Sequence, residues 1–434
     1  MSTTINGTNR ADDILNTISG AVINAQGGND YIRSLGNKVS INGGAGNDTI
    51  YNWGEDATLI GGAGADKLVN SESGTNAKID GGADSDYIVN YANLNSPIVG
   101  GTGNDSIYNF GYVTELTGGA GDDKIFNKND GSRIKIDGGD GYDLLYNEGT
   151  SYVTMLGGKD EDTLDNIEGD YAYLGGGADN DEINNPHGNF ARIYGGDGND
   201  SISNGMVYYD ESFNSTVYSS NNVTISGGAG KDYIRNLYGD SVSISGGDGN
   251  DSIRSGENYI NSRGGVTEYG KKVTINGGEG DDAISLVSAS RNNLIQYAAG
   301  DGDDTVYGFD ADDTLNLGAS TAYSTTKSGG DILVSVKGGS VLLKDAANLS
   351  KVNIVGTGTS ALISGTAKAE KLSNEKDEST LNALAGNDTI ENSGEYVMVY
   401  GGDGADKITN TGGGVTLSGD AGNDTIVNSG SNVS

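Results

Sequence analysis

The sequence of 434 residues has no cysteine, one histidine and two prolines. Without cysteine there is neither a disulfide framework nor a thiolate metal site. With His187 as its single histidine, the chain lacks the residues that an imidazole-based zinc site or a histidine-dependent catalytic triad requires. It follows Pro186 in a predicted turn and is interpreted as a surface residue. Most templates for enzyme active sites are excluded at this step.

Basic residues are scarce as well, because 26 Lys or Arg stand against 61 Asp or Glu, giving a formal charge of -35. Such a charge repels nucleic acid and anionic membranes, and it favours the binding of many divalent cations. No segment is long and apolar enough to cross a bilayer. The first ten residues lack the basic start and the apolar run of a cleavable export signal.

Hydrophobic residues make up only 34% of the chain, whereas 74 residues are glycine, and this composition reflects an internal repeat. The unit GGAGNDTIYN at 43–52 recurs 15 times between Gly7 and Tyr307, with 18 to 20 residues between successive starts over the first eleven copies. Four more copies start between Gly365 and Gly419, which makes 19 in all.

Each unit is typical of a turn, a short strand, a second turn and a second short strand, as in Thr49–Tyr51 and Val39–Ile41. A unit this short cannot bury its apolar face alone, so we expect successive units to stack as coils of a parallel β-solenoid. The predicted class is all-β, and 15 coils at about 4.8 Å per coil would extend roughly 70 Å. The predicted domains are a solenoid over 1–308, an antiparallel module over 309–364 and a second solenoid segment over 365–434.

Position six of the unit is Asp in 18 of 19 copies, and Glu370 is the exception. Stacking would place these carboxylates in one column, about 4.8 Å apart, where like charges repel unless cations lie between the turns. Calcium fits, since it takes six to eight oxygen ligands, and a glycine turn exposes backbone carbonyls beside the carboxylate. The predicted carboxylate ligands are Asp30, Asp48, Asp66, Asp86, Asp105, Asp123, Asp143, Asp162, Asp181, Asp200, Asp232, Asp251, Asp282, Asp304, Asp388, Asp406 and Asp424. The predicted carbonyl ligands include those of Gly43, Gly44, Gly46, Gly195, Gly196, Gly198, Gly246, Gly247 and Gly249.

The segments GGAGNDTI at 43–50, GGDGNDSI at 195–202 and GGDGNDSI at 246–253 resemble the hemolysin-type RTX nonapeptide, G-G-x-G-x-D-x-U-x. The resemblance implies a β-roll that folds on calcium, in bacterial proteins exported by a type I route with an uncleaved C-terminal signal. Two departures are visible. Only alternate turns carry the motif, so we expect the calcium ions in one column along one edge. The chain also ends inside the repeat pattern, without a recognisable secretion region.

Five copies have a residue other than glycine at position four. We expect these residues to alter the bend or to place a positively charged side chain at the site. The sites near Arg10 and Lys368 are expected to be empty. If each adjacent pair of turns frames one ion, 15 turns give 14 ions and 4 turns give 3, so 17 ions would bring +34 against -35. The alternative is a metal-free solenoid with acidic turns. The substituted positions are Arg10, Asp84, Asp160, Asp179 and Lys368.

Two further columns follow from the stacking. Asn occupies position ten in 15 of 19 copies and is interpreted as structural, because stacked Asn side chains can hydrogen-bond to one another and to the turn. Position nine should point outward, and over six coils it is aromatic or Val. This stripe either marks a partner or glycan surface or consists of ordinary strand-forming residues. Its residues are Tyr51, Val69, Val89, Tyr108, Phe126 and Tyr146.

The repeat is interrupted in three places. Residues 205–221 and 256–271 are insertions into the second turn of two units that are one coil apart, so they should lie side by side. They form either a binding face or loops that the fold tolerates. Over 309–364, segments 332–337 and 340–344 predict a hairpin around Gly338–Gly339, with further strands at 314–317 and 352–355. We interpret this module as a cap or spacer.

The repeat pattern runs to both ends of the chain, which predicts head-to-tail association into filaments or a fragment of a longer protein.

The predicted function is that of a secreted or cell-surface calcium-binding scaffold or adhesive element without catalytic activity. It would fold in a calcium-dependent way and associate with copies of itself or with a surface glycan. The alternative is the repeat module of a secreted toxin or polysaccharide-modifying enzyme. Ice binding through Thr-x-Asn turns is disfavoured, because only Thr102–Asn104 has that pattern.

Overall fold

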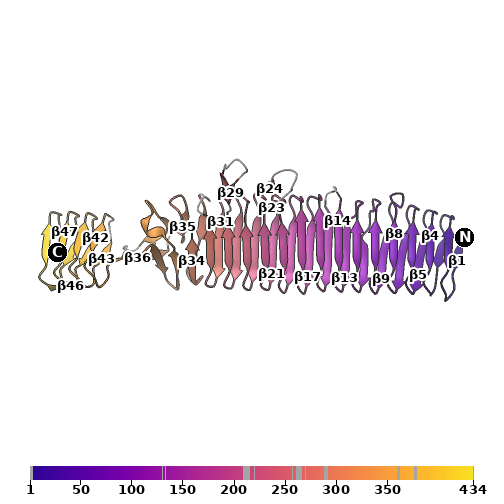
Figure 1. Ribbon diagram of the computed structural model, residues 1–434, viewed down its shortest axis with the longest axis horizontal. Helices are drawn as coiled ribbons and strands as arrows, with labels where there is room; N and C mark the ends of the chain where they lie inside the picture. The colour runs from indigo at the N-terminus through magenta and orange to yellow at the C-terminus, as the bar shows by residue number, and fades with distance from the viewer. Residues whose placement is uncertain are drawn as a thin grey trace. The chain divides into compact units, whose positions relative to one another are not determined.

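The computed structural model describes residues 3–129, 131, 133–208, 216–218, 220–256, 258–260, 266–268, 270–287, 292–319, 321–358, 362–375 and 379–433. The chain divides into two compact units, Met1–Val273 and Thr274–Ser434. Both consist of short parallel strands that stack coil upon coil (Figure 1). In the described part of the chain the only helical element is the 3-10 turn η1 (Ala346–Asn348), and no helix there could span a membrane. The predicted all-β parallel solenoid is confirmed.

In the first unit every coil contributes one strand to each of two parallel sheets, A and B. The Gly-rich turn joins the sheet A strand to the sheet B strand, and the second turn leads on to the next coil. Sheet A holds β1 (Thr4–Asn6), β3 (Val22–Asn24), β5 (Ser40–Ala45), β7 (Thr58–Ala63), β9 (Lys78–Ala83), β11 (Ile98–Thr102), β13 (Glu115–Ala120), β15 (Lys135–Asp140), β17 (Thr154–Lys159), β19 (Tyr173–Ala178), β21 (Arg192–Asp197), β25 (Thr224–Ala229) and β27 (Ser243–Asp248). Sheet B holds β2 (Asp13–Asn16), β4 (Tyr31–Ser34), β6 (Thr49–Asn52), β8 (Lys67–Asn70), β10 (Tyr87–Asn90), β12 (Ser106–Asn109), β14 (Lys124–Lys128), β16 (Leu144–Glu148), β18 (Thr163–Ile167), β20 (Glu182–Asn185), β22 (Ser201–Asn204), β26 (Tyr233–Asn236) and β28 (Ser252–Ser255).

The core is one stack of aliphatic side chains from each sheet. In β6, Ile50 is fully buried between two half-exposed residues, as the period of two along a strand requires. Its register partners are Ile32 in β4 and Leu68 in β8, so like residues lie above one another. Ile41 of β5 is buried in the same way in sheet A. Each such side chain contributes about 1.5 to 3 kcal/mol by burial, and the repeat multiplies that contribution coil by coil.

The second turn is held by a ladder of buried Asn side chains, in agreement with their structural interpretation. Asn52 Nδ2 donates to Asn70 Oδ1 at 2.8 Å and to the carbonyl of Gly54 at 2.8 Å. The main-chain N–H of Gly54 in turn donates to Asn52 Oδ1 at 3.1 Å. Each amide is therefore bonded both within its own turn and to the next coil. The ladder runs without a break through Asn52, Asn70, Asn90, Asn109, Asn127, Asn147, Asn166, Asn185, Asn204 and Asn236.

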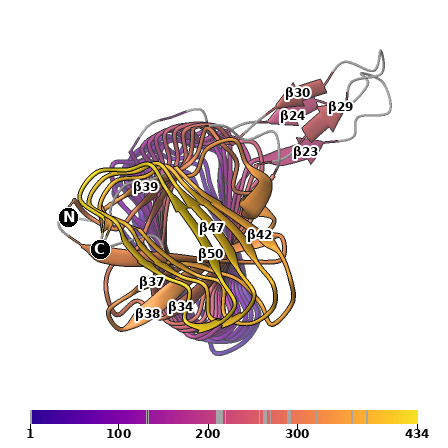
Figure 2. The same ribbon diagram turned by 90° about the vertical axis from the view of Figure 1, so that its left-hand side faces the viewer.

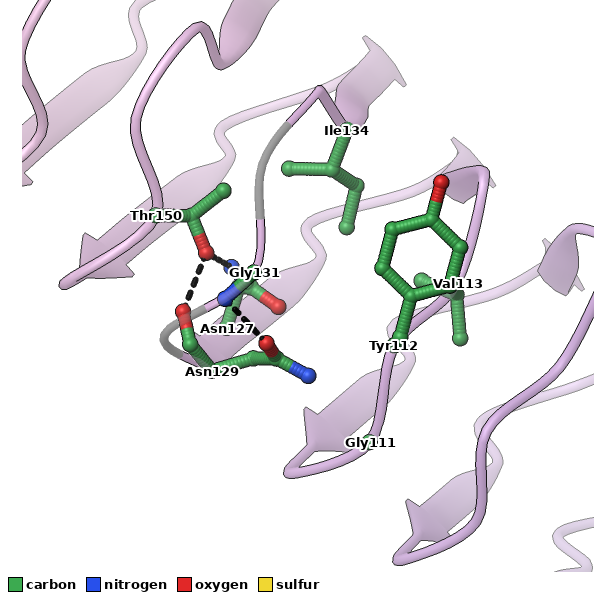
Figure 3. Close-up of a pocket in the computed structure, with 8 residues that line it drawn as sticks. All are labelled: Gly111, Tyr112, Val113, Asn127, Asn129, Gly131, Ile134 and Thr150. Atoms are coloured by element: carbon green, nitrogen blue, oxygen red, sulfur yellow. Dashed lines mark hydrogen bonds between the residues drawn. The ribbon is translucent and has the colours of Figure 1, made fainter.

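At Asn127 the ladder borders a small cavity (Figure 3). Here Asn127 Nδ2 donates to Thr150 Oγ1 at 2.9 Å, and the Thr150 hydroxyl donates to the carbonyl of Asn129. The cavity is about 10 Å³ and is lined by both polar and apolar groups, including Tyr112 and Ile134. That volume holds about one water molecule, so the site is a local packing feature of the turn.

Both insertions leave the first unit as antiparallel hairpins. One consists of β23 (Met206–Tyr208) and β24 (Thr216–Tyr218), and the other of β29 (Asn258–Ile260) and β30 (Val266–Glu268). They project from the same edge of the roll, as the spacing predicts (Figure 2). Residues 209–215, 219, 257, 261–265 and 269 of these insertions lie outside the described residues.

The second unit begins with strands that repeat the coil pattern. One of its sheets holds β31 (Thr274–Glu279), β33 (Leu294–Gln296), β35 (Thr314–Asn316) and β39 (Asn353–Val355), which pair in parallel. In the other, β32 (Ala283–Leu286) pairs in parallel with β34 (Asp303–Tyr307), and β34 pairs in parallel with β38 (Gly339–Leu343).

The predicted hairpin is confirmed, since β37 (Asp331–Val336) pairs with β38 in antiparallel register and β36 (Ala322–Ser328) pairs with β37. The strands expected at 314–317 and 352–355 are also present. They continue the parallel sheet of β31 and β33, however, because the chain returns to that sheet on either side of the hairpin, whose strand β38 pairs with β34 in the other sheet. The strand β40 (Thr357–Gly358) pairs with β36. The three-domain division stays a prediction.

The last part of the second unit is another short stack. One of its sheets holds β41 (Leu362–Ser364), β43 (Thr380–Asn382), β45 (Met398–Tyr400) and β48 (Thr416–Ser418), and the other holds β42 (Lys371–Asn374), β44 (Thr389–Asn392), β47 (Lys407–Asn410) and β50 (Thr425–Asn428). The short strands β46 (Asp403–Gly404) and β49 (Ala421–Gly422) pair at the Gly-rich turn. Its core contains Leu381, Ile390, Val399 and Ile408.

The Asn ladder predicts that Asn109→Ala lowers the urea midpoint measurably. The change removes the donors to Asn127 and Gly111 and takes from the Nδ2 of Asn90 one of its two acceptors, which costs about 2 to 4 kcal/mol. Urea unfolding followed by circular dichroism at saturating calcium would measure this. Asn9→Ala, at an exposed Asn, is the control and should stay within about 0.5 kcal/mol of the natural protein. Equal midpoints for both variants would contradict the ladder's role.

Candidate metal centre

The Gly-rich turn brings the backbones of neighbouring coils into close contact. Gly44 and Gly46 have φ values of 108° and 118°, in the region that favours glycine. A β-carbon at Gly43 would collide with Oδ2 of Asp48 and lie 2.5 Å from the carbonyl oxygen of Gly61 in the next coil. The turn thus requires glycine both for its backbone conformation and for the approach of two oxygens. The same positive φ occurs at Gly196, Gly198, Gly247 and Gly249, and the same crowding occurs at Gly195.

The Asp side chains at position six lie inside the turn, not on its surface. Asp30 through Asp304, and Asp388 and Asp406, are between 0% and 3% exposed. Their carboxylates form a ladder in which the N–H of one Asp donates to Oδ1 of the Asp in the next coil. Asp48 N–H, for example, donates to Asp66 Oδ1 at 2.7 Å, and Asp86 N–H to Asp105 Oδ1 at 2.7 Å. One oxygen of each carboxylate therefore holds successive coils together.

The second oxygen, Oδ2, is buried without a hydrogen-bond partner in most described turns. It faces the first glycine of its own turn, where the carbonyl of the next coil's first glycine also converges, as at Gly43 and Gly61. A buried carboxylate oxygen without a donor is costly and calls for a cation or a proton. The residues with this orphaned oxygen are Asp30, Asp48, Asp66, Asp86, Asp105, Asp123, Asp143, Asp162, Asp181, Asp200, Asp232, Asp388 and Asp406.

The donor set fits a hard cation such as calcium, because it consists of carboxylate and backbone carbonyl oxygens. In the described part of the chain no three Asp, Glu or His side chains come together as a metal cluster. A cation here would therefore depend on the carboxylates of neighbouring turns together with glycine carbonyls. Asp251 and Asp282 are equally buried in their turns. Asp304 is 3% exposed and its Oδ1 accepts from the N–H of Asp282 at 3.1 Å, whereas Asp424, in the last turn, is half-buried and accepts from Asp406 N–H at 2.9 Å.

Two turns differ, and they are the first turn of each stack of repeats. Oδ2 of Asp12 accepts from the main-chain N–H of Thr8 at 2.6 Å and from its hydroxyl at 3.0 Å. Glu370 accepts likewise from the main-chain N–H of Thr366. These acids already have donors, which supports the expectation that the turns at Arg10 and Lys368 hold no cation. The signal that sequence reasoning missed is the Thr at position two of both turns.

The non-glycine residues at position four of three other turns change the local backbone angle. Asp84, Asp160 and Asp179 have φ values of 73°, 69° and 75°, against 118° for Gly46 and 135° for Gly198, so they adopt the left-handed conformation that Asp tolerates. Asp84 Oδ2 also accepts from the N–H of Gly64 in the preceding coil at 3.1 Å. The Asp at position six of each of these turns stays buried.

Burial changes the protonation of the column. It raises the pKa of Asp86 and of Asp162 from the ordinary 3.8 to about 8, and that of Asp66 to about 7. The hydrogen bond from the preceding Asp N–H opposes this shift, while the charge of neighbouring Asp residues adds to it. Without a cation the column would therefore take up protons near neutral pH.

The rings of the position-nine stripe pack against one another. Tyr108 stacks on Phe126 with centroids 5.0 Å apart, and Phe126 lies 5.8 Å from Tyr146. Tyr51 stacks on Trp53 at 5.9 Å. Such pairs contribute about 0.5 to 1.5 kcal/mol each beyond burial, so the stripe supports the roll itself. Its role as a partner surface stays a prediction.

Segments of the chain that contain Gly-rich turns are similar to a known family of calcium-binding repeats. The model of the RTX calcium-binding nonapeptide repeat, built on four copies, matches residues 24–59, 95–108, 192–206, 219–236, 239–258, 297–320 and 399–432. These segments include Gly-rich turns of both units. No curated protein matches the chain. Among solved structures, a mutant of the PL6 family alginate lyase AlyGC aligns over 100% of this chain and 96% of its own at 8% identity. Its TM-score of 0.19 is too low to indicate a shared fold.

Asp105→Asn tests the orphaned oxygen. The amide keeps the acceptor for Asp86 N–H, and its Nδ2 replaces a charged oxygen close to the carbonyl of Gly118. We expect the variant to be less stable than the natural protein in calcium, by about 1 to 3 kcal/mol, and to keep more β-structure in EDTA, where the natural chain unfolds. Urea unfolding in calcium and circular dichroism in EDTA measure the two differences. Asp12→Asn, where Thr8 already supplies donors, is the control and should show neither change; unchanged stability of Asp105→Asn in calcium would contradict the site.

The raised pKa values also predict a pH dependence with a definite sign. The folded, calcium-free protein binds more protons than the unfolded chain between about pH 4 and 8, because Asp66, Asp86 and Asp162 have pKa values of about 7 to 8 instead of 3.8. Its free energy of unfolding should therefore fall as the pH rises through this window. Calcium competes with these protons, so the midpoint of a calcium titration should move to higher concentration as the pH falls from 8 to 6. A midpoint independent of pH would contradict the involvement of these carboxylates.

Proposed function

Because this chain is an RTX-type calcium-binding repeat protein, we propose that calcium completes its fold and that the folded roll serves outside the cell as a non-catalytic scaffold or adhesive element. The observation that carries the proposal is the column of buried Asp Oδ2 atoms that lack a donor in most described turns. So many buried carboxylates repel one another unless cations or protons neutralise them.

The column would act as a folding switch. A carboxylate and carbonyl cage built from several separate coils does not exist in the unfolded chain, so the free energy of binding calcium becomes free energy of folding. Sites in extracellular proteins typically bind calcium with dissociation constants of about 0.1 to 1 mM. The chain would then stay unfolded where calcium is low and fold after export, which fits a type I-like route to the cell surface. The seventeen ions expected from the sequence become fifteen when the turns at Arg10 and Lys368 hold none, because each stack of repeats then loses one adjacent pair of turns.

The residues that repeat in every coil support a scaffold rather than an enzyme. The Asp at position six and the Asn at position ten are the recurrent polar side chains, and both are buried in the turns that join the coils. Their hydrogen bonds run along the stack, as between Asp48 and Asp66 or Asn52 and Asn70. The outward residues vary from coil to coil. Adhesion, a glycan partner and head-to-tail self-association belong to this proposal.

Circular dichroism with size-exclusion chromatography, after EDTA treatment and during a calcium titration at pH 7.5, tests the proposal. We expect a coil spectrum in EDTA that turns to β-structure, and a falling hydrodynamic radius, near about 0.1 to 1 mM calcium. Magnesium at the same concentrations is the control and should be less effective, because it prefers strict octahedral geometry and keeps its water. A β-spectrum that EDTA leaves unchanged would overturn the folding switch. A sharp monomer peak at high protein concentration would reject the filament.

A further inference from the structure

A second cavity of the described structure lies on the outer face of sheet B in the first unit and has a volume of about 340 Å³. Four consecutive strands, β18, β20, β22 and β26, supply its polar side chains in register. Asp165 pairs with Asn184, Asn184 with Ser203 and Ser203 with Arg235. A second row, two residues further along each strand or turn, is largely apolar and consists of Ile167, Pro186, Gly205 and Leu237.

The cavity exists because the row of large side chains at position nine is interrupted. The aromatic stripe ends at Tyr146, whose register partner in the next coil is Asp165. From there the row continues with the short side chains of Asp165, Asn184 and Ser203, and a long side chain returns only at Arg235. The guanidinium group of Arg235 therefore lines one end of the hollow along the stack, and Asp165 lines the other.

Arg235 is the unusual member of this set. Its Nε is buried and has no hydrogen-bond partner, and no ion pair of the side chain is present among the described residues. The Nε of Arg33, also in position nine, is likewise buried without a partner, but the guanidinium of Arg33 contacts Asp13 at 2.7 Å through Nη2. In a chain with 61 acidic and 26 basic residues, an arginine that lines a cavity without a carboxylate partner calls for an anion from outside.

The other polar groups suit hydroxyls. Asn184 Nδ2 donates to Asp165 Oδ1 at 3.0 Å and to Glu182 Oε1 at 3.1 Å, so the amide is occupied and fixes Asp165. The second oxygen of Asp165 and the hydroxyl of Ser203 remain as an acceptor and as a donor or acceptor for ligand hydroxyls. Ile167, Pro186 and Leu237 offer apolar contacts to the carbon skeleton.

We propose that this cavity binds a small hydroxylated carboxylic acid, with its carboxylate on the guanidinium of Arg235 and its hydroxyl groups toward Ser203 and Asp165. A carboxylate matches the planar fork of arginine in a bidentate way. A single negative charge is preferred over a phosphate dianion, because the acidic residues Asp165 and Glu182 lie three and two coils from Arg235 on the same sheet and the whole chain carries -35. The volume is that of a small-ligand site.

Isothermal titration calorimetry of the calcium-saturated full chain tests the proposal with three probes. D-Gluconate carries both groups, D-sorbitol has the same hydroxyls without the carboxylate, and acetate has the carboxylate alone. We expect gluconate to bind measurably more tightly than either of the others. Arg235→Gln should weaken gluconate binding roughly 10- to 100-fold, as for the loss of a charge-assisted hydrogen-bond pair. Ser203→Leu, which fills the hollow and leaves the charge, should abolish binding.

Arg192→Gln is the matched control, because Arg192 is an exposed arginine on sheet A and the variant changes the net charge equally. It should bind gluconate as the natural protein does. Any weak chelation of calcium by gluconate would be the same in all variants. Equal affinity for gluconate and sorbitol, or equal effects of Arg235→Gln and Arg192→Gln, would overturn the proposal. Circular dichroism of each variant in calcium confirms the fold, so a failure here is distinct from a failure of the calcium switch.

Discussion

The structure depends on one buried carboxylate in every coil. Stacking sets the Asp residues of successive coils at strand spacing, and the turn buries them almost completely, as with Asp105 at 1% exposure. One oxygen of each carboxylate binds the backbone of the preceding coil, while the other has no donor in most described turns. The same side chain thus joins two coils and creates a charge that the protein alone does not neutralise. A hard cation such as calcium, held by carboxylate and carbonyl oxygens, would neutralise this charge.

The turns at both edges of the roll join successive coils through a ladder of polar side chains, but only one of the two ladders has all its hydrogen bonds. On the second turn, an Asn such as Asn109 supplies both donors and acceptors, so its ladder is complete without a ligand. On the Gly-rich turn, an Asp such as Asp105 supplies only acceptors, so its ladder is incomplete. The difference of one amide group makes one edge self-sufficient and the other dependent on a cation. Asp12 and Glu370 show the exception, since Thr8 and Thr366 provide the missing donors.

The outer faces of the sheets are free of these constraints and can vary along the stack. On sheet B, the row at position nine runs from Tyr51 to Tyr146 as aromatic or Val residues, is then short and polar, and continues with Arg235 and Arg254. A solenoid can therefore carry a packing stripe and a ligand-sized hollow on one face without disturbing its core, because each coil contacts only its neighbours. The hairpins after Gly205 and Gly256 are accommodated for the same reason.

The sequence by itself determined the parallel roll, its core positions, the Asp and Asn columns and the oxygen chemistry of the turn. These features recur in each unit, and a short period shows which side chain faces inward. Only the tertiary structure decided how far each carboxylate is buried, which of its oxygens has a partner, and that Thr8 satisfies Asp12. It also decided that β35 and β39 continue a parallel sheet, and that Asp165 and Arg235 line one hollow. Those outcomes depend on the register between residues in different coils, and insertions of varying length hide that register until the coils are stacked.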